Sequence, residues 1–143
     1  MRKCKECTAC CSGTLYGMAK GHYFGNGTPC HFLNKNCTIY EDRPPMCRDF
    51  QCLWLKDQTF PTWMKPSTVY LLIVPKKNHL FEYYIVYNMQ VSPADKSKQD
   101  YALKYFQTWA RNKNWVHCVN GVTFFHGDDN FKFYVQHYNL LAI

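Results

Sequence analysis

The stretch CKECTACC, residues 4–11, holds four of the nine cysteines of this 143-residue chain. Cys4, Cys7 and Cys10 follow one another at intervals of three positions, and Cys11 comes directly after Cys10. Two intervening residues let both thiolates of a pair reach one metal ion around a tight turn. A disulfide scaffold, a metal centre and a redox centre are the candidate explanations. Whichever of them holds these thiols decides how the N-terminal half folds.

Four further cysteines follow in CHFLNKNCTIYEDRPPMCRDFQC, residues 30–52. Eight thiols are the number needed for two four-thiolate sites or for one polynuclear site with bridging sulfurs, and soft thiolates select zinc or iron–sulfur clusters. Neighbouring side chains generally point apart, so the adjacent pair in the first stretch is expected to serve different metals or different corners of one cluster. The predicted metal ligands are Cys4, Cys7, Cys10, Cys11, Cys30, Cys37, Cys47 and Cys52.

Targeting signals are not evident in the sequence. No apolar run of signal-peptide length follows Met1, and the apolar stretch VYLLIV, residues 69–74, is far shorter than the ~20 residues that span a bilayer. The expectation is a soluble, cytoplasmic chain with no membrane partner. Thiols stay reduced in that compartment, and clustered cysteines there are more often metal ligands than disulfides.

The identity of the metal is less constrained than the ligand set. The spacing of Cys4, Cys7 and Cys10 matches the first three ligands of a bacterial ferredoxin run. Cys11 departs from that run, because the fourth ligand there lies further on and is followed by proline. Zinc, as two ions in two closed tetrahedral sites, is therefore the favoured cofactor, and an iron–sulfur cluster is the alternative.

The charge of the chain suggests a nucleic-acid partner at first, because the formal net charge is +7. That count leaves the thiols neutral, whereas eight thiolates with two divalent ions would lower it to about +3. The lysines are also scattered, with no run of five basic residues. Nucleic-acid binding is therefore not expected, and an unidentified protein partner is compatible with the sequence.

The cysteine pattern, C-x2-C-x2-C-C followed by C-x-I-Y-x-x-R-P-x-x-C-R-x-F-x-C, resembles the CxxCxxCC cysteine-cluster family. That family is described as a zinc- or iron-chelating domain (the YkgJ type), and its activity is poorly defined. The resemblance covers residues 4–52, about a third of the chain, and departs at Thr8-Ala9, where many members carry a glycine. The downstream positions are Cys37, Ile39, Tyr40, Arg43, Pro44, Cys47, Arg48, Phe50 and Cys52.

Two arginines of this pattern are expected to support the cluster. Arg43 and Arg48 could offset the negative charge of thiolates and donate N–H bonds to sulfur. The alternative for each is a surface ion pair, for instance with Glu41, Asp42 or Asp49. Tyr40 is expected to pack rather than to take part in chemistry.

The second half shows ordinary secondary-structure patterns. Residues 67–74 and 79–89 are expected to form a hairpin, with the first strand closed by Pro75. A helix is predicted over residues 92–114, with Ser92 as N-cap and Pro93 at the first helical position. Asn120-Gly121 predicts a type I′ turn between two strands, and residues 131–138 are expected to be a final strand.

These patterns together predict an α+β fold. An irregular, metal-stapled, cysteine-rich region, residues 1–58, is expected to pack on a small antiparallel sheet with one main helix, residues 59–143, as one compact domain. Cys118 lies in a predicted strand and is expected to be a small core residue.

The sequence contains no Ser-His-Asp pattern, HExxH helix or phosphate-binding loop, so no catalytic residue is predicted and an enzyme is not expected. The favoured function is a metal-binding protein that holds zinc through eight thiolates in a structural or interaction role. An iron–sulfur protein for electron transfer, redox chemistry or enzyme support is one alternative. A metal-stapled structural or assembly protein is the other.

Overall fold

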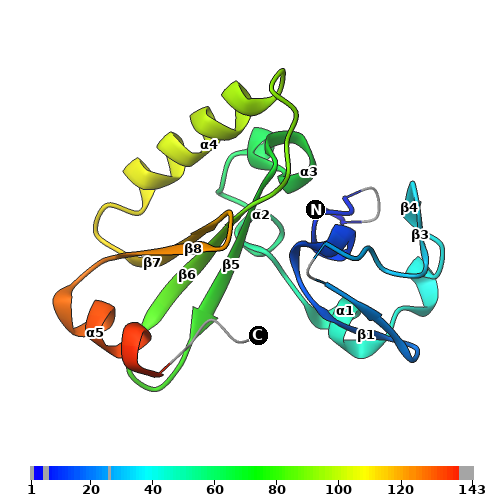
Figure 1. Ribbon diagram of the computed structural model, residues 1–143, viewed down its shortest axis with the longest axis horizontal. Coiled ribbons are helices and arrows are strands. Elements are labelled where there is room, and N and C mark those ends of the chain that lie inside the picture. Colours follow the sequence, from blue (N-terminus) through cyan, green and yellow to red (C-terminus); the bar gives the residue numbers. More distant parts are fainter. Residues whose placement is uncertain (1, 5–6, 26, 139–143) are drawn as a thin grey trace. The chain divides into compact units, whose positions relative to one another are not determined.

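The computed structural model describes residues 2–4, 7–25 and 27–138, and its internal contacts divide the chain into two units, Met1–Thr68 and Val69–Ile143. Both helices and strands are present, so the expected α+β class is confirmed (Figure 1). The division lies ten residues beyond the expected boundary at residue 58. The reason is local, because Arg2 and Trp54 donate hydrogen bonds to the carbonyl oxygens of Phe60 and Thr62 and keep this segment with the first unit.

The Met1–Thr68 unit consists of very short elements. None of those described exceeds five residues, which is below the length at which a helix or a sheet is stable by itself in water. The elements in chain order are η1 (Cys10–Thr14), β1 (Gly17–Ala19), β2 (His22–Phe24), β3 (Leu33–Asn34), β4 (Asn36–Cys37), η2 (Tyr40–Asp42), α1 (Pro45–Asp49), α2 (Leu53–Lys56), η3 (Thr62–Met64) and, at the boundary, α3 (Pro66–Val69).

Glycines allow two backbone segments of this unit to touch. Gly13 has a φ of 107°, and a Cβ added to it would lie 2.8 Å from the carbonyl carbon of Gly27. The Gly27 N–H donates to the Gly13 carbonyl oxygen at 3.2 Å. Only glycine combines this backbone angle with so close an approach. The glycine-rich loop therefore lies directly on η1, the turn that carries two of the predicted ligands.

The Val69–Ile143 unit is built on a four-stranded sheet with the order β5-β6-β7-β8. The outer pairings are antiparallel, and the central pairing of β6 with β7 is parallel, so the sheet is mixed rather than wholly antiparallel. A parallel pairing requires a crossover, which α4 provides between β6 and β7. The elements are β5 (Leu71–Lys77), β6 (Glu82–Asn88), α4 (Lys96–Trp109), β7 (Asn114–Val119), β8 (Val122–His126) and α5 (Asp129–Tyr138).

Helix α4 packs on the sheet through aromatic rings. Phe106 is fully buried, and its ring centroid lies 5.1 Å from that of Trp115 on β7 and 6.1 Å from that of Tyr84 on β6. Near the other end of the helix, the buried Gln99 amide donates to the carbonyl oxygens of Tyr70 and Met89 at 2.7 and 2.9 Å. These bonds satisfy backbone groups that flank the β5–β6 hairpin.

The start of α4 differs from the prediction. The N-cap residue is Asp95 rather than Ser92, and Pro93 lies in a turn before the helix. The Ser92 hydroxyl donates to the Asp95 carboxylate at 3.1 Å, and the Tyr70 hydroxyl donates to the same oxygen at 3.3 Å. These two hydrogen bonds hold the carboxylate that precedes the helix.

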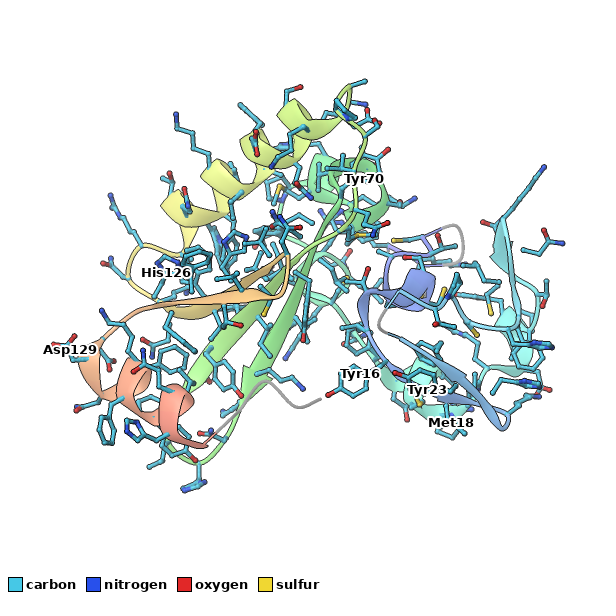
Figure 2. All side chains as sticks on the ribbon, in the orientation of Figure 1. Tyr16, Met18, Tyr23, Tyr70, His126 and Asp129 are labelled. Carbon is cyan, nitrogen blue, oxygen red and sulfur yellow. The ribbon has the colours of Figure 1, made fainter. Side chains whose placement is uncertain are left out.

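The first strand of the sheet also differs in its limits. Residues 66–69 form α3, and Tyr70 (labelled in Figure 2) reverses the chain with a φ of 59° before β5 begins. The strand does not end at Pro75 but continues to Lys77. Proline is tolerated there because β5 is an edge strand, where one side of the backbone needs no ladder hydrogen bond. The expected hairpin with β6 is confirmed.

The expected final strand over residues 131–138 is wrong, because this segment forms α5. Alternating aromatic residues imitate the period of a strand, but Phe131 and Val135 are four positions apart and both are buried, whereas Phe133 is 61% exposed. The Asp128 carboxylate accepts a hydrogen bond from the Phe131 N–H at 2.8 Å and caps the helix. Phe131 and Val135 pack on Tyr83, Ile85 and Val116 of the sheet.

The predicted type I′ turn between β7 and β8 is confirmed. Asn120 and Gly121 have φ angles of 51° and 76°, both positive as a type I′ turn requires.

In the part of the chain that the structure describes, no helix has the length and apolar character needed to cross a bilayer.

Candidate metal centre

The predicted ligands lie on short segments of the Met1–Thr68 unit, each fixed by backbone hydrogen bonds. The Cys7 N–H donates to the Cys4 carbonyl oxygen at 2.9 Å, which closes the tight turn expected for two residues between ligands. Cys10 and Cys11 begin η1, and the Cys11 N–H donates to the Thr8 carbonyl oxygen at 3.2 Å. The first stretch of cysteines thus wraps as two consecutive turns.

The second stretch is attached to the first by its backbone. The Cys30 N–H donates to the Cys11 carbonyl oxygen at 2.8 Å. The Leu33 N–H donates to the Cys30 carbonyl oxygen at 3.0 Å, and Cys37 pairs with Leu33 across the β3–β4 hairpin. Lys35 turns that hairpin with a φ of 61°. The hydrogen bond between their backbones thus holds Cys11 and Cys30 next to each other, although they are far apart in the sequence.

Two short helices carry the last two predicted ligands. Cys47 lies in α1, which starts after the extended Pro44 with Pro45 at its first position, where a proline is well suited to begin a helix. Cys52 is the N-cap of α2, and its carbonyl oxygen accepts from the Lys56 N–H at 2.9 Å. The N–H groups of Leu55 and Trp54 also favour the charged form of the Cys52 sulfur.

The electrostatics show which thiols lie near one another. Burial raises the pKa of Cys47, and the neighbouring thiols of Cys10, Cys30 and Cys37 raise it further. Burial raises the pKa of Cys52 to about 11, with Cys7 and Cys10 as further contributors. Cys10 is therefore within electrostatic range of both Cys47 and Cys52. Clustered sulfurs resist ionisation because each charge repels the next.

Cys10 and Cys11 interact directly, although neighbouring side chains were expected to point apart. A hydrogen bond with the Cys11 thiol, together with burial, raises the pKa of Cys10 well above its ordinary value. The Cys11 thiol also donates to the Thr8 carbonyl oxygen at 3.5 Å. The wide turn of η1 brings the two sulfurs to the same side of the backbone.

Arg43 is placed against the cysteines in the manner expected of a supporting residue. Its Nη1 donates to the Cys4 Sγ at 3.4 Å, and its Nε donates to the Tyr40 carbonyl oxygen at 2.8 Å. The guanidinium lies 3.8 Å from the centroid of the Tyr40 ring. Its charge also favours ionisation of Cys10 and Cys47.

Arg48 is placed differently. Its Nε lies 3.5 Å from a carboxylate oxygen of Asp49, and its side chain is 59% exposed. This is the surface ion pair considered as the alternative for both arginines. Such exposed pairs contribute little to stability.

Tyr40 was expected only to pack, but it contacts a predicted ligand. Its hydroxyl lies 3.9 Å from the Cys4 Sγ, and the Tyr40 pKa is raised by burial and by this contact. Arg2 was not singled out in the sequence at all. Its guanidinium donates to the carbonyl oxygens of Trp54 and Asp57 at 2.6 and 2.9 Å and fixes the chain two residues before Cys4. No sequence signal marks a residue that binds only carbonyl oxygens.

All nine cysteines lie in described positions and are free thiols. Within residues 2–4, 7–25 and 27–138, no three Cys, His, Asp or Glu side chains form a ready-made metal site. Binding of a metal through thiols requires that each of them release its proton.

The ninth cysteine and the histidine next to Cys30 contact other groups. Cys118 lies on β7 in the Val69–Ile143 unit, against the group of apolar residues that α5 covers. His31, next to Cys30, stacks on His22 with ring centroids 3.8 Å apart and an interplanar angle of 4°. Parallel rings do not direct their nitrogen lone pairs to a common ion.

Comparisons of the chain with family models, with curated proteins and with solved structures found no match. The interpretation of the cysteine group accordingly depends on its own residues and their placement.

Proposed function

We propose that the Met1–Thr68 unit is a metal-binding module in which eight cysteine thiolates hold two zinc ions, and that the metal has a structural or interaction role. The observation that carries the proposal is the grouping around Cys47. The thiols of Cys10 on η1, Cys30 before β3 and Cys37 on β4 lie near enough to Cys47 on α1 to raise its pKa, although these residues span positions 10–47 of the sequence.

The chemistry of the group fits zinc. All the donors are sulfur, which is the ligand set of closed structural zinc sites. Nine basic and five acidic side chains lie in residues 1–68. Eight thiolates with two divalent ions would therefore leave the unit with about zero net charge. Arg43 supplies a cation beside Cys4 and an N–H bond to its sulfur, which is how outer residues stabilise metal thiolates.

A resident zinc would supply the central positive charge that the clustered sulfurs lack. The residues of this chain would then act as closed ligands, because every donor is a protein thiol and no position is left for a substrate. This arrangement favours a structural role over catalysis.

The test is the metal content of protein purified under anaerobic conditions, with an absorption spectrum of the same sample. We expect about two zinc ions per chain and a colourless solution. Iron with acid-labile sulfide and an absorption band near ~400 nm would replace the proposal with an iron–sulfur protein. Protein that folds fully without any metal would contradict both.

A further inference from the structure

We propose that the outer face of α4 and the turn after it bind single-stranded nucleic acid. The binding surface consists of the rings of Tyr101, Tyr105 and Trp109 and the cations Lys104, Arg111 and Lys113, and we call it the α4 surface. It lies wholly in the Val69–Ile143 unit and does not depend on the proposed zinc module.

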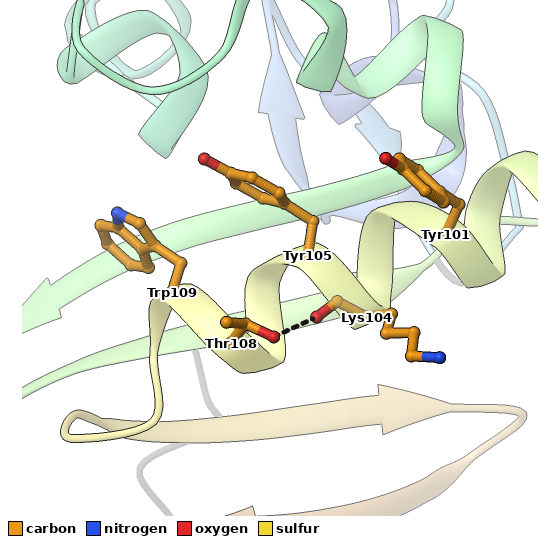
Figure 3. Close-up of a pocket in the computed structure, with 5 residues that line it drawn as sticks. All are labelled: Tyr101, Lys104, Tyr105, Thr108 and Trp109. Atoms are coloured by element: carbon orange, nitrogen blue, oxygen red, sulfur yellow. Dashed lines mark hydrogen bonds between the residues drawn. The ribbon is translucent and has the colours of Figure 1, made fainter.

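Three aromatic side chains project from the same side of α4. Tyr101, Tyr105 and Trp109 are four residues apart, and Figure 3 shows their rings side by side along the helix. A helix rises 1.5 Å per residue, so successive rings are about 6 Å apart along the axis. Together with Lys104 and Thr108 they line a surface hollow of about 320 Å³.

The rings differ in how firmly they are held. Tyr101 is 66% exposed, whereas Trp109 is half-buried, with its centroid 5.4 Å from that of Tyr84 and 5.6 Å from that of Phe106. Trp109 is therefore anchored to the core and Tyr101 extends into solvent. A row of rings that runs from a held to an exposed side chain offers planar surfaces for stacking, and stacking on them costs little further side-chain entropy.

The charges of this unit are unevenly distributed. Four lysines form ion pairs with nearby carboxylates, at distances of 2.6–3.7 Å, and the Asp128 carboxylate caps α5. For Lys104, Arg111 and Lys113 the described residues provide no ion pair. The unit has eight basic and five acidic side chains, and these three are among the four cations, Lys76 being the fourth, that no described ion pair neutralises.

Lys104 and Lys113 lie beside the aromatic row, and Arg111 lies in the turn that follows α4. The Lys113 Nζ is 5.0 Å from the centroid of the Trp109 ring. Backbone hydrogen bonds from the Lys113 N–H to Ala110, at 2.8 Å, and from the Arg111 N–H to Thr108, at 3.5 Å, fix the turn that carries both cations. Lys104 borders the same hollow as the rings. These cations are separated by neutral residues within positions 104–113 and form no basic run, which is why the sequence did not predict this partner.

A single-stranded nucleic acid uses both kinds of group on this surface. Its bases stack on aromatic rings and its phosphates attract cations, largely without regard to sequence. An apolar protein partner would bury the three cations without a counter-charge, which is costly. A duplex would offer phosphates but no free base face. The combination therefore favours unpaired bases on a phosphate backbone.

The experiment is fluorescence anisotropy of labelled twelve-nucleotide dT and U strands with the whole 143-residue chain as purified. We expect binding whose affinity falls as salt rises from 50 to 200 mM, with a slope near ~2 in the log–log plot for about three phosphate contacts. Lys104→Glu should weaken binding about tenfold. Tyr101→Ala should weaken it by a similar factor, because one stacked base is lost.

Matched variants separate stacking from loss of fold. Tyr101→Phe keeps the ring and should bind as the unmodified chain does, whereas Tyr101→Leu keeps only apolar bulk and should bind weakly. Phe133→Ala removes a ring of comparable exposure (61%) from α5 and should change nothing. Equal binding of a duplex, equal displacement by poly-glutamate, or unchanged affinity of Tyr101→Ala would each overturn the proposal.

Discussion

The two units of this chain differ in what holds them together. The Met1–Thr68 unit contains eight cysteines and no described element longer than five residues, whereas the Val69–Ile143 unit contains a four-stranded sheet and a fourteen-residue helix. In the second unit Ile85, Val116 and Phe131 are fully buried in one cluster. The comparison teaches that the second unit is specified by apolar packing. In the first unit, the proposed metal thiolates would add to a smaller apolar core that includes Phe24, Phe60 and Met64.

The largest effect should come from removing a thiol on which the first unit depends. Cys47→Ser is expected to lose bound metal and to unfold the Met1–Thr68 unit, because structural zinc contributes roughly 10 kcal/mol or more to the folding of small sites. The measurement is metal content together with hydrogen exchange resolved by segment. Residues 69–143 should remain protected.

The matched control is Cys118→Ser, which changes a cysteine of the second unit. It should keep its metal and lose only about 1–2 kcal/mol of unfolding free energy, since a half-buried thiol becomes a hydroxyl beside apolar residues. If Cys47→Ser keeps its metal and its melting temperature, Cys47 is not a ligand.

A substitution in the core of the second unit should destabilise that unit and leave the first unit unchanged. Phe131→Ala removes a fully buried ring and is expected to destabilise the Val69–Ile143 unit by about 3–5 kcal/mol. Denaturant unfolding followed by tryptophan fluorescence measures this change. Metal content should not change, and loss of zinc from this variant would show that the first unit cannot fold without the second.

The two arginines of the cysteine-rich stretch provide a smaller, paired test. Arg43→Met removes the N–H bond to Cys4 and the nearby positive charge, and should weaken zinc binding by about 10–100-fold. Arg48→Met removes only an exposed ion pair and should have almost no effect. Competition with a zinc-binding dye measures both, and equal losses would assign the two residues the same role.

The smallest predicted effect is the pH dependence of the free energy of unfolding, which has opposite signs in metal-free and metal-bound protein. In metal-free, reduced protein the folded-state pKa of Cys52 is raised from 9.0 to about 11. Its contribution to stability is therefore complete below pH 9 and is lost as pH rises through 11, about 1 kcal/mol by pH 10. With metal bound, protons compete for the thiolates, so stability should fall instead as pH is lowered below 7. Chemical unfolding across pH 5–10 tests both signs.

The sequence predicted those features that depend on a few neighbouring residues. The turn at Asn120-Gly121 and the β5–β6 hairpin are both present, because their signals are local. The parallel pairing of β6 with β7 joins segments about thirty residues apart, and no local pattern encodes it. A strand was expected in place of α5 because its alternating aromatic residues match the two-residue period of a strand as well as a helix. Only the hydrogen bond that caps the segment at Asp128 distinguishes a helix from a strand.

For the candidate site, spacing was enough to nominate the cysteines but not to rank the residues around them. Arg43 and Arg48 are the same residue type five positions apart, and either could have faced Cys4. The deciding factor is the position of each relative to α1: Arg43 precedes Pro44 and folds back on Tyr40, whereas Arg48 extends from the helix toward solvent.

The strand order has a consequence for self-association. A sheet with two free edges can recruit strands from other chains, and proteins resist this with proline and lysine at the edge. Edge strand β5 carries both, in Pro75, Lys76 and Lys77. The opposite edge, β8, carries neither and exposes Val122 and Phe124. Aggregation of this chain by strand addition should therefore begin along β8, and a lysine placed there is the change that would suppress it.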